Sequence, residues 1–341
     1  MRYKKSCIKS IILKHLIPAY FLFLCCSPLF AQNITLQGKA KGAEGRKLSV
    51  YTYTDLITYS QKKIATANID TGGAFSITFE QKVTSPVFLK IDFNEAMIYA
   101  EPDNTYKLSI DCPDCNSPDD KTNPYLNPKF LKLSITNNDS ASLNSAISLF
   151  DQMYDNFIIS NYASLLKMRN KSKIDTFRLK MNDTFKYINN NYFSSYTRYR
   201  IACIEMFAQA GSEKLFMSKY FAGQPVLLDN SGYMEFFNEF FKDYLLSGSE
   251  NISRTDLEKT INGLKSYTAL IDTLGKDSLL QNEVLRELVA LKGRGELCEN
   301  SDFDKDAILG MFNEVAGSSK FEFLKTIAKN YLIKFTSLTK G

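Results

Sequence analysis

Residues 112–128 read CPDCNSPDDKTNPYLNP and divide the chain into two halves with different sequence patterns. Four of the nine prolines fall within this stretch, so no helix or central strand is expected to pass through it. Strand-like sequence precedes the stretch and helix-like sequence follows it. We therefore expect an α+β protein: an antiparallel β-sandwich over 32–111, a linker or junction over 112–136, and an irregular all-α helical domain over 137–341.

The first half alternates apolar and polar residues. The clearest case is AFSITF at 74–79, where Phe75, Ile77 and Phe79 share one face. The preceding DTGG, at 70–73, predicts a hairpin turn into this strand. Comparable short runs occur at 34–38, 47–53, 63–69, 87–91, 97–99 and 105–110. Seven strands separated by turn sequences are typical of an antiparallel sandwich.

In the second half the apolar residues recur at helical spacing. One long stripe consists of Leu143, Ile147, Phe150, Tyr154, Phe157 and Ile158. Further helices are expected at about 174–189, 193–210, 231–246 and 304–316. We find no repeat of fixed period, and therefore expect an irregular helical domain rather than a solenoid.

Capping signals suggest where the remaining helices begin and end. A capping box is predicted at 255–258 (TDLE), opening a helix that Gly275 closes. Asp277 is expected to cap a helix over 279–291 that ends at Gly293. A second capping box, SKFE at 319–322, should open a helix that runs to about Phe335.

The first 31 residues have the pattern of a secretory signal peptide. A basic segment is followed by an apolar run from Ile17 to Leu24, and Ala31 is a suitable last residue before cleavage. A lipoprotein signal needs a small residue before the acylated cysteine, whereas Leu24 precedes Cys25. We therefore expect an exported protein of the periplasm or cell envelope, and favour soluble export over a lipid anchor. The apolar run of the leader is too short for a membrane span and is broken by Pro18, and no apolar run beyond the leader reaches membrane length.

Removing this leader changes the charge and the available chemistry. The leader contains five of the 42 Lys and Arg residues and none of the 37 Asp and Glu residues, so the rest of the chain has no net formal charge. The chain's basicity is thus no evidence for nucleic-acid binding. The only histidine, His15, also lies in the leader, and the chain has no Trp. Catalytic triads and zinc sites that require histidine are therefore excluded from the mature chain.

Cys112 and Cys115 form the only Cys-x-x-Cys pair. Such a pair can be a redox dithiol, which in thioredoxin-like folds is activated at a helix N-terminus. Here no helix-like sequence follows the pair, and the charges of Asp111 and Asp114 would raise the pKa of a neighbouring thiol. We favour a disulfide that staples a loop, or a passive pair, over a catalytic dithiol. A zinc ribbon would need a second such pair, so no metal site is predicted.

Other candidate sites have simpler structural interpretations. Cys203 and Cys298 are expected to be small core residues. The aromatic helix face from Phe236 to Tyr244 could grip a ligand, but this spacing is more typical of a core. Asp114, Asp119 and Asp120 could bind calcium. They lack the spacing and glycine of a calcium loop, which favours a solvated acidic turn. No cofactor is predicted.

The order of these segments resembles that of a known family. The segments that carry the resemblance are DTGGAFSITF, EPDNTYKLSID and NPKFLKLSITNND in the first part, followed by PVLLDNSGYMEFFNEFFKDYL, LLQNEVLRELVALKG and SKFEFLKTIAKNYL. Together they resemble the region that precedes the catalytic domain in the TlpA/ResA-like thiol-disulfide oxidoreductases exported by Bacteroidetes-type bacteria.

The resemblance implies a function by association. In that family a thioredoxin-like domain carries a Trp-Cys-x-x-Cys pair, which has no counterpart among these 341 residues. We therefore expect an exported, non-catalytic accessory or binding module, whose partner is an envelope protein or a separately encoded thioredoxin-like domain. Two alternatives stay open: a thiol-disulfide oxidoreductase that uses Cys112 and Cys115, and a protein that binds an envelope glycan or lipid.

Overall fold

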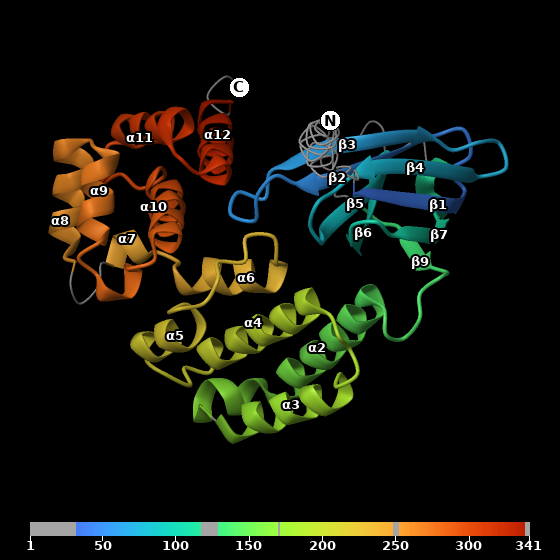
Figure 1. Cartoon of the computed structure of the whole chain (residues 1–341), viewed down its shortest axis with the longest axis horizontal. Coiled ribbons are helices and arrows are strands. Elements are labelled where there is room, and N and C mark those ends of the chain that lie inside the picture. The colour runs from blue at the N-terminus through green and yellow to red at the C-terminus, as the bar shows by residue number, and fades with distance from the viewer. Residues whose placement is uncertain (1–31, 117–128, 170, 248–251, 338–341) are drawn as a thin grey trace, which may run out of the picture.

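The computed structural model describes residues 32–116, 129–169, 171–247 and 252–337. A β region comes first and a helical region follows it, so the chain is α+β as predicted (Figure 1). The expected leader, residues 1–31, lies outside the described residues, and its export function stays a prediction.

The β region contains two sheets. The described strands are β1 (Asn33–Lys41), β2 (Lys47–Tyr53), β3 (Gln61–Asn68), β4 (Ala74–Glu80), β5 (Ser85–Ile91), β6 (Asn94–Ala100), β7 (Thr105–Asp111), β8 (Lys129–Phe130) and β9 (Lys132–Ile135). One sheet has the order β4-β1-β7-β9 and the other has the order β3-β2-β5-β6-β8. All seven strands expected before residue 112 are therefore present.

The sheets are mixed, so the expectation of a purely antiparallel arrangement is wrong. β1 pairs in parallel with β7, and β6 pairs in parallel with β8, whereas the other pairs are antiparallel. Parallel partners must be joined by a crossover. The chain makes one by leaving β1, building strands of the second sheet, and returning as β7. Alternation within each strand carries no information about such long-range pairing.

The turn at 70–73 does not make the predicted hairpin. The turn itself forms, with Gly73 at a positive φ of 80° and Gly73 N donating to Asp70 O. However, β3 pairs with β2 whereas β4 pairs with β1 in the other sheet. The turn therefore carries the chain from one sheet to the other. The reason for this crossing is burial of the apolar face of β4. Its side chains Phe75, Ile77 and Phe79 belong to the core cluster to which both sheets contribute.

The predicted junction also contributes to both sheets. After β7, the chain forms the short 3₁₀ helix η1 (Pro113–Asn116), and beyond the undescribed residues 117–128 it forms β8 and β9. β9 pairs antiparallel with β7, and β8 pairs with the start of β6. Strand pairing thus continues past residue 112.

The helical region begins at α2, and its elements within the described residues have the following bounds. They are α2 (Leu143–Met168), α3 (Lys171–Thr184), α4 (Asn191–Phe207), α5 (Glu213–Tyr220), α6 (Ser231–Phe240), α7 (Tyr244–Ser247), α8 (Arg254–Glu258), the π-helical turn η3 (Lys259–Leu264), α9 (Tyr267–Leu274), the 3₁₀ turn η4 (Ser278–Leu280), α10 (Glu283–Leu297), α11 (Lys305–Ser318) and α12 (Glu322–Ser337). The stripe on α2 is confirmed, since Leu143, Ile147, Phe150 and Tyr154 are buried.

Two capping predictions are wrong. Ser253 rather than Thr255 caps α8, because its side chain accepts a hydrogen bond from Asp256 N. Asp277 caps only the short turn η4, and Asn282 caps α10. In each case a second capping residue lies within a few positions, and local sequence does not rank the two.

Gly293 does not end a helix, because α10 continues to Leu297. A Cβ atom at Gly293 would lie 2.4 Å from Cγ of Leu245. The glycine therefore allows α7 to lie close against α10. Glycine is favoured both where two helices approach closely and where a helix ends. The presence of Gly293 in the sequence therefore does not distinguish these two possibilities.

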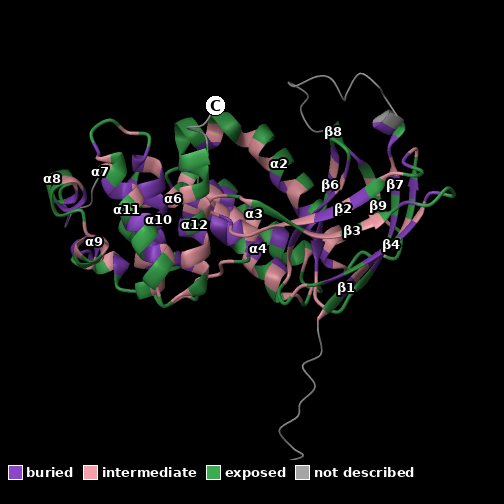
Figure 2. Cartoon of the chain, turned by 90° about the horizontal axis from the view of Figure 1, so that it is seen from above, coloured by how far each residue is buried: buried purple, intermediate pink, exposed green. Residues whose placement is uncertain are grey.

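Figure 2 shows buried residues along the strands and on the inward sides of the helices. The largest core cluster of the helical region is rich in aromatic residues from α4, α5 and α6. Stacked and edge-on rings from these helices surround Phe236, which is completely buried. Such pairs add specific geometry to the burial of apolar area.

Asparagine side chains join the two regions. Asn144 on α2 pairs with the free edge of β6: its Nδ2 donates to Tyr99 O at 2.8 Å, and its Oδ1 accepts from Tyr99 N at 2.8 Å. Asn238 on α6 donates to Leu56 O at 2.8 Å, and Asn330 on α12 donates to Asp55 Oδ2 at 2.6 Å. The loop between β2 and β3 is thus held between α6 and α12 (Figure 1). Leu56 itself belongs to the core of the helical region.

No helix within the described ranges has both the length and the apolar character that a membrane span requires.

Candidate functional site

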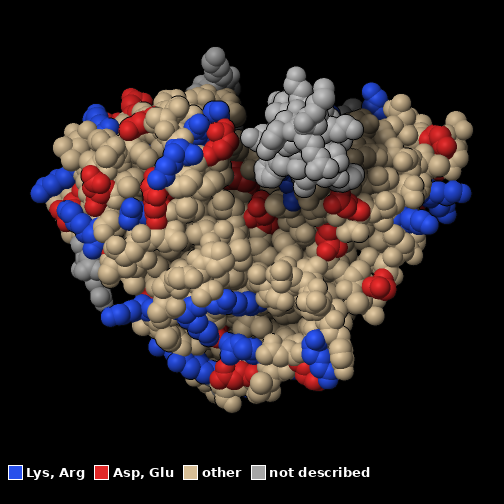
Figure 3. All heavy atoms as spheres, viewed as in Figure 1, with Lys and Arg blue, Asp and Glu red and all other residues tan. Residues whose placement is uncertain are grey.

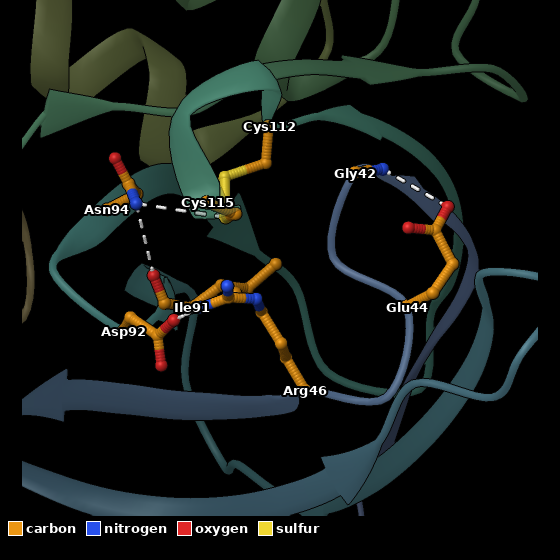
Figure 4. Close-up of a disulfide and its surroundings, with 8 residues drawn as sticks. All are labelled: Gly42, Glu44, Arg46, Ile91, Asp92, Asn94, Cys112 and Cys115. Carbon is orange, nitrogen blue, oxygen red and sulfur yellow. Dashed lines mark hydrogen bonds and ion pairs between the residues drawn. A yellow bond between two sulfur atoms is a disulfide. The ribbon is translucent and has the colours of Figure 1, made fainter. Parts of the chain in front are cut away.

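The predicted site pair, Cys112 and Cys115, is joined in a disulfide directly after β7 (Figure 4). Cys112 N donates to Lys41 O at 2.9 Å, which continues the pairing of β7 with β1 for one more residue. Pro113 then starts the single turn η1, in which Cys115 N donates to Cys112 O at 3.2 Å. The backbone after β7 therefore brings the two sulfur atoms together.

Both cysteines lie in the core of the β region. Cys112 is 2% exposed and Cys115 is 4% exposed. Asn94, which is buried, lies over the second sulfur: its Nδ2 is 3.7 Å from Cys115 Sγ and 3.5 Å from Ile91 O (Figure 4). Thiol-disulfide exchange needs an attacking thiolate to reach one of the sulfurs. In this conformation the surrounding core leaves little room for such an attack.

The two other cysteines of the described chain are free thiols. Burial raises the pKa of Cys298 to about 11, and burial raises the pKa of Cys203 to about 12. A thiol nucleophile needs the opposite shift, since the thiolate is the reactive form. Cys298 is a buried core residue, as the sequence predicted, whereas Cys203 is only partly buried and packs against the same cluster from its edge.

The aromatic helix face is core and not a ligand surface. Phe237 is 0% exposed and Phe241 is 1% exposed, and Tyr244 is also buried. Their rings are used in packing α6 against its neighbours. The interpretation of this face as a glycan or lipid site is therefore wrong.

The acidic candidates for calcium binding are Asp114, Asp119 and Asp120. Asp119 and Asp120 lie outside the described residues, as does the side chain of Asp114. Elsewhere in the described ranges, no group of three or more His, Cys, Asp or Glu side chains could hold a metal ion.

A pocket between α3, α4 and α5 is the candidate site that sequence reasoning missed. Its volume is about 490 Å³. Arg178 from α3, Arg198 from α4 and Lys219 from α5 line it, and no carboxylate does. Blue side chains gather over this part of the surface in Figure 3. Apolar side chains form the rest of the wall: Met181, Phe185, Ile188, Phe193 and Ile201.

Behind the pocket, Glu205 of α4 organises two of its cations. Lys219 Nζ donates to both carboxylate oxygens of Glu205 at 2.9 Å, and Arg178 Nη2 donates to Oε1. Tyr220 donates its hydroxyl hydrogen to Oε2 at 2.8 Å. The Tyr220 hydroxyl is protonated at neutral pH and can donate, and burial raises its pKa further. Glu205 is only 8% exposed, and both of its carboxylate oxygens accept hydrogen bonds from these neighbours.

A second cavity of about 690 Å³ lies on another side of α4, between α2, α4 and α6. It is lined by Ile159, Tyr162 and Phe207 and by three acids, Asp155, Glu235 and Glu239. Arg200 pairs with Glu235 and lies 4.2 Å from the ring centre of Tyr154. The two cavities therefore have opposite charge: cations line the first, and acids outnumber the single arginine in the second.

A second buried charge lies in α10. Arg294 is 0% exposed, and its Nε donates to Ala290 O at 3.1 Å. Within the described chain its Nη1 and Nη2 have no hydrogen-bond partner. The guanidinium instead lies between two rings, 4.5 Å from the centre of Tyr267 and 4.9 Å from the centre of Phe312. Burial lowers the pKa of Arg294 to about 10.

No protein-family model matches this chain, and no curated protein matches it. The chemistry of the site must therefore be inferred from its residues. Arg178, Arg198 and Lys219 are widely spaced along the chain and form no motif, so no local signal in the sequence could have grouped them. Only the packing of α3, α4 and α5 brings them to one pocket.

Proposed function

We propose that the chain is an exported, non-catalytic binding module of the cell envelope. It would correspond to the accessory region that precedes the catalytic domain in TlpA/ResA-like oxidoreductases, which its segments resemble. One observation carries the proposal: the pocket between α3, α4 and α5 offers three cations and an apolar wall at the protein surface. The Cys112–Cys115 disulfide, in contrast, lies within the β core.

In this proposal the β region is a support for the binding surface. Because both sheets contribute to one apolar core, we take them to be the two layers of a sandwich. Asn144, Asn238 and Asn330 then hold this support against α2, α6 and α12. A partner, either an envelope protein or a separately encoded thioredoxin-like domain, would be positioned by the assembled module.

An insulin-reduction assay separates this proposal from the oxidoreductase alternative. Residues 32–341 and the Cys112→Ser variant are each supplied with dithiothreitol, and insulin precipitation is followed by turbidity. We expect both proteins to match the rate with dithiothreitol alone, because the sulfur atoms are buried. An acceleration by the native protein that Cys112→Ser abolishes would instead establish a redox enzyme that uses this pair.

A further inference from the structure

We propose that the pocket between α3, α4 and α5 binds a small organic carboxylate whose body is apolar and aromatic. The inference rests on the proposed binding function and specifies the class of ligand. It depends on three properties of the pocket: the balance of charge among its cations and their partners, the contacts that orient Arg198, and the composition of its wall.

The first property is an excess of positive charge. Three cations line the pocket, and two carboxylates contact them from outside it. Glu205 pairs with both Arg178 and Lys219, and Asp175 pairs with Arg178 at 2.7 Å. Three cations and two carboxylates leave one positive charge without a partner. A ligand with a single negative charge would balance it, whereas a doubly charged phosphate would leave an excess negative charge.

The uncompensated charge is on Arg198. Its hydrogen-bond acceptors are neutral: Nη1 donates to Gln224 Oε1 at 3.2 Å, and Nη2 donates to the carbonyl oxygen of Lys219 at 2.9 Å. No ion pair to Arg198 occurs among the described residues. An arginine with neutral acceptors keeps its full charge available to a carboxylate.

Arg198 is exposed, but its contacts favour one orientation before any ligand binds. Its guanidinium carbon lies 5.4 Å from the ring centre of Tyr199 and 5.7 Å from that of Tyr220. Together with its two hydrogen bonds, these contacts restrict the side chain. Less conformational entropy is then lost on binding, which favours affinity.

The wall of the pocket defines the rest of the ligand. Met181, Phe193 and Ile201 line it beside the cations, and Phe185 adds a further ring. The volume of about 490 Å³ falls within the range of small-molecule sites. A carboxylate near Arg198 would therefore place an attached ring against apolar and aromatic side chains. The cavity between α2, α4 and α6 is a poor alternative, because Asp155, Glu235 and Glu239 would repel the same ligand.

Calorimetric titration with 2-naphthoate tests the proposal. We expect saturable binding by residues 32–341, and weakening by about tenfold in Arg198→Gln, the order of one charge-assisted contact. 2-Naphthol, which has the same rings without the charge, should bind at least about tenfold more weakly. Inorganic phosphate, which lacks the apolar body, should also bind more weakly than 2-naphthoate.

Lys180→Gln is the matched control. Lys180 also lies on α3, but it lines a different cavity, between α2 and α3. This variant removes the same charge from the chain and should retain the native affinity within about twofold. Arg198→Lys, which keeps the charge but not the planar fork, should fall between Arg198→Gln and the native protein. Circular dichroism spectra verify that each variant is folded.

Three results would overturn the inference: no saturable binding of 2-naphthoate, equal affinity for 2-naphthol, or equal losses in Arg198→Gln and Lys180→Gln. The last result would indicate a general charge effect or the α2–α3 cavity. None of these results bears on insulin reduction. Failure of the ligand class is therefore distinguishable from failure of the non-catalytic function, which the insulin assay tests.

Discussion

Glu205 and Arg294 are both buried charges of the helical region, and their surroundings differ. Glu205 accepts hydrogen bonds from Arg178, Lys219 and Tyr220. Arg294 has one backbone acceptor and two flanking rings, and its Nη1 and Nη2 lack partners within the described residues. Hydrogen bonds and ion pairs compensate the carboxylate for much of the hydration free energy that it loses on burial. The guanidinium has much less compensation of this kind.

The difference indicates what each charge contributes. Removing a buried ion that neighbours already satisfy leaves those neighbours without their partner, which costs stability. Removing a buried ion without a counterion relieves a desolvation penalty. Glu205 should therefore stabilise the fold while it shapes the binding pocket. Arg294 should cost stability, which the stacking of the two rings offsets only in part.

The largest expected effect is that of Glu205→Gln. The amide directs N–H groups at two cations and offers only one acceptor oxygen. We expect the free energy of unfolding to fall by about 2 kcal/mol, less than for a fully buried pair because Arg178 and Lys219 are partly exposed. Urea denaturation measures the change.

Asp175→Asn is the control for this prediction, since it removes the other carboxylate that contacts Arg178. The Asp175 side chain is 65% exposed, so its loss should change the free energy of unfolding by less than about 0.5 kcal/mol. Equal effects of the two variants would mean that the buried network has no special role.

Arg294→Met should have the opposite sign. Methionine fills a similar volume between the rings of Tyr267 and Phe312 without a charge. We expect the free energy of unfolding to rise by about 1 kcal/mol, since relief of desolvation exceeds the lost stacking and the lost bond to Ala290.

Lys292→Met, two residues away on α10, provides the comparison for that variant. Lys292 is buried but donates to Phe241 O at 3.2 Å and pairs with Glu296. Its replacement should destabilise the protein by about 1 kcal/mol. If Arg294→Met is also destabilising, attraction to the two rings outweighs the desolvation penalty, and the contrast with Glu205 disappears.

The smallest expected effect is a pH dependence of the Arg294→Met gain. Burial lowers the pKa of Arg294 to about 10 in the folded state, below its usual 12.5. Between these values the unfolded chain binds more protons at this residue, so its contribution to native stability rises with pH. The gain from Arg294→Met should therefore shrink by about 0.8 kcal/mol between about pH 9 and pH 10.5.

Tyrosines act in the opposite direction in the same pH range. Burial raises the pKa of Tyr106 to about 12 and raises the pKa of Tyr267 as well. Unfolded tyrosines ionise near pH 10, so stability falls above that value in both proteins. The difference between native protein and variant removes most of this shared trend. A gain that stays constant with pH would show that Arg294 titrates normally in the folded state.

Predictions from the sequence succeeded where the signal is local. Alternation in segments such as 74–79 identified the strands, and the stripe from Leu143 to Tyr154 identified α2. They failed where two distant segments meet. The predicted helix end at Gly293 is wrong, because this glycine lies within α10 and makes room for Leu245. The parallel pairing of β1 with β7 left no mark in the alternation of either strand.

The candidate site could not be predicted for the same reason. Arg178, Arg198 and Lys219 are ordinary residues of three separate helices, and any of them alone would be read as a solvated charge. Likewise, no pattern in the sequence around Asn144 or Asn330 indicates that these side chains join the β and helical regions. The one short motif that did suggest chemistry, Cys112 with Cys115, lies in the β core.

The sequence by itself determined the α+β class and the places of most strands and helices, because these depend on composition and on periodicity over a few neighbouring residues. The tertiary structure alone decided the sheet order, the burial of the disulfide and of the aromatic face, and the pocket of cations. Each of these depends on which distant surfaces pack together, and the free energy of that packing comes from contacts that no local pattern records.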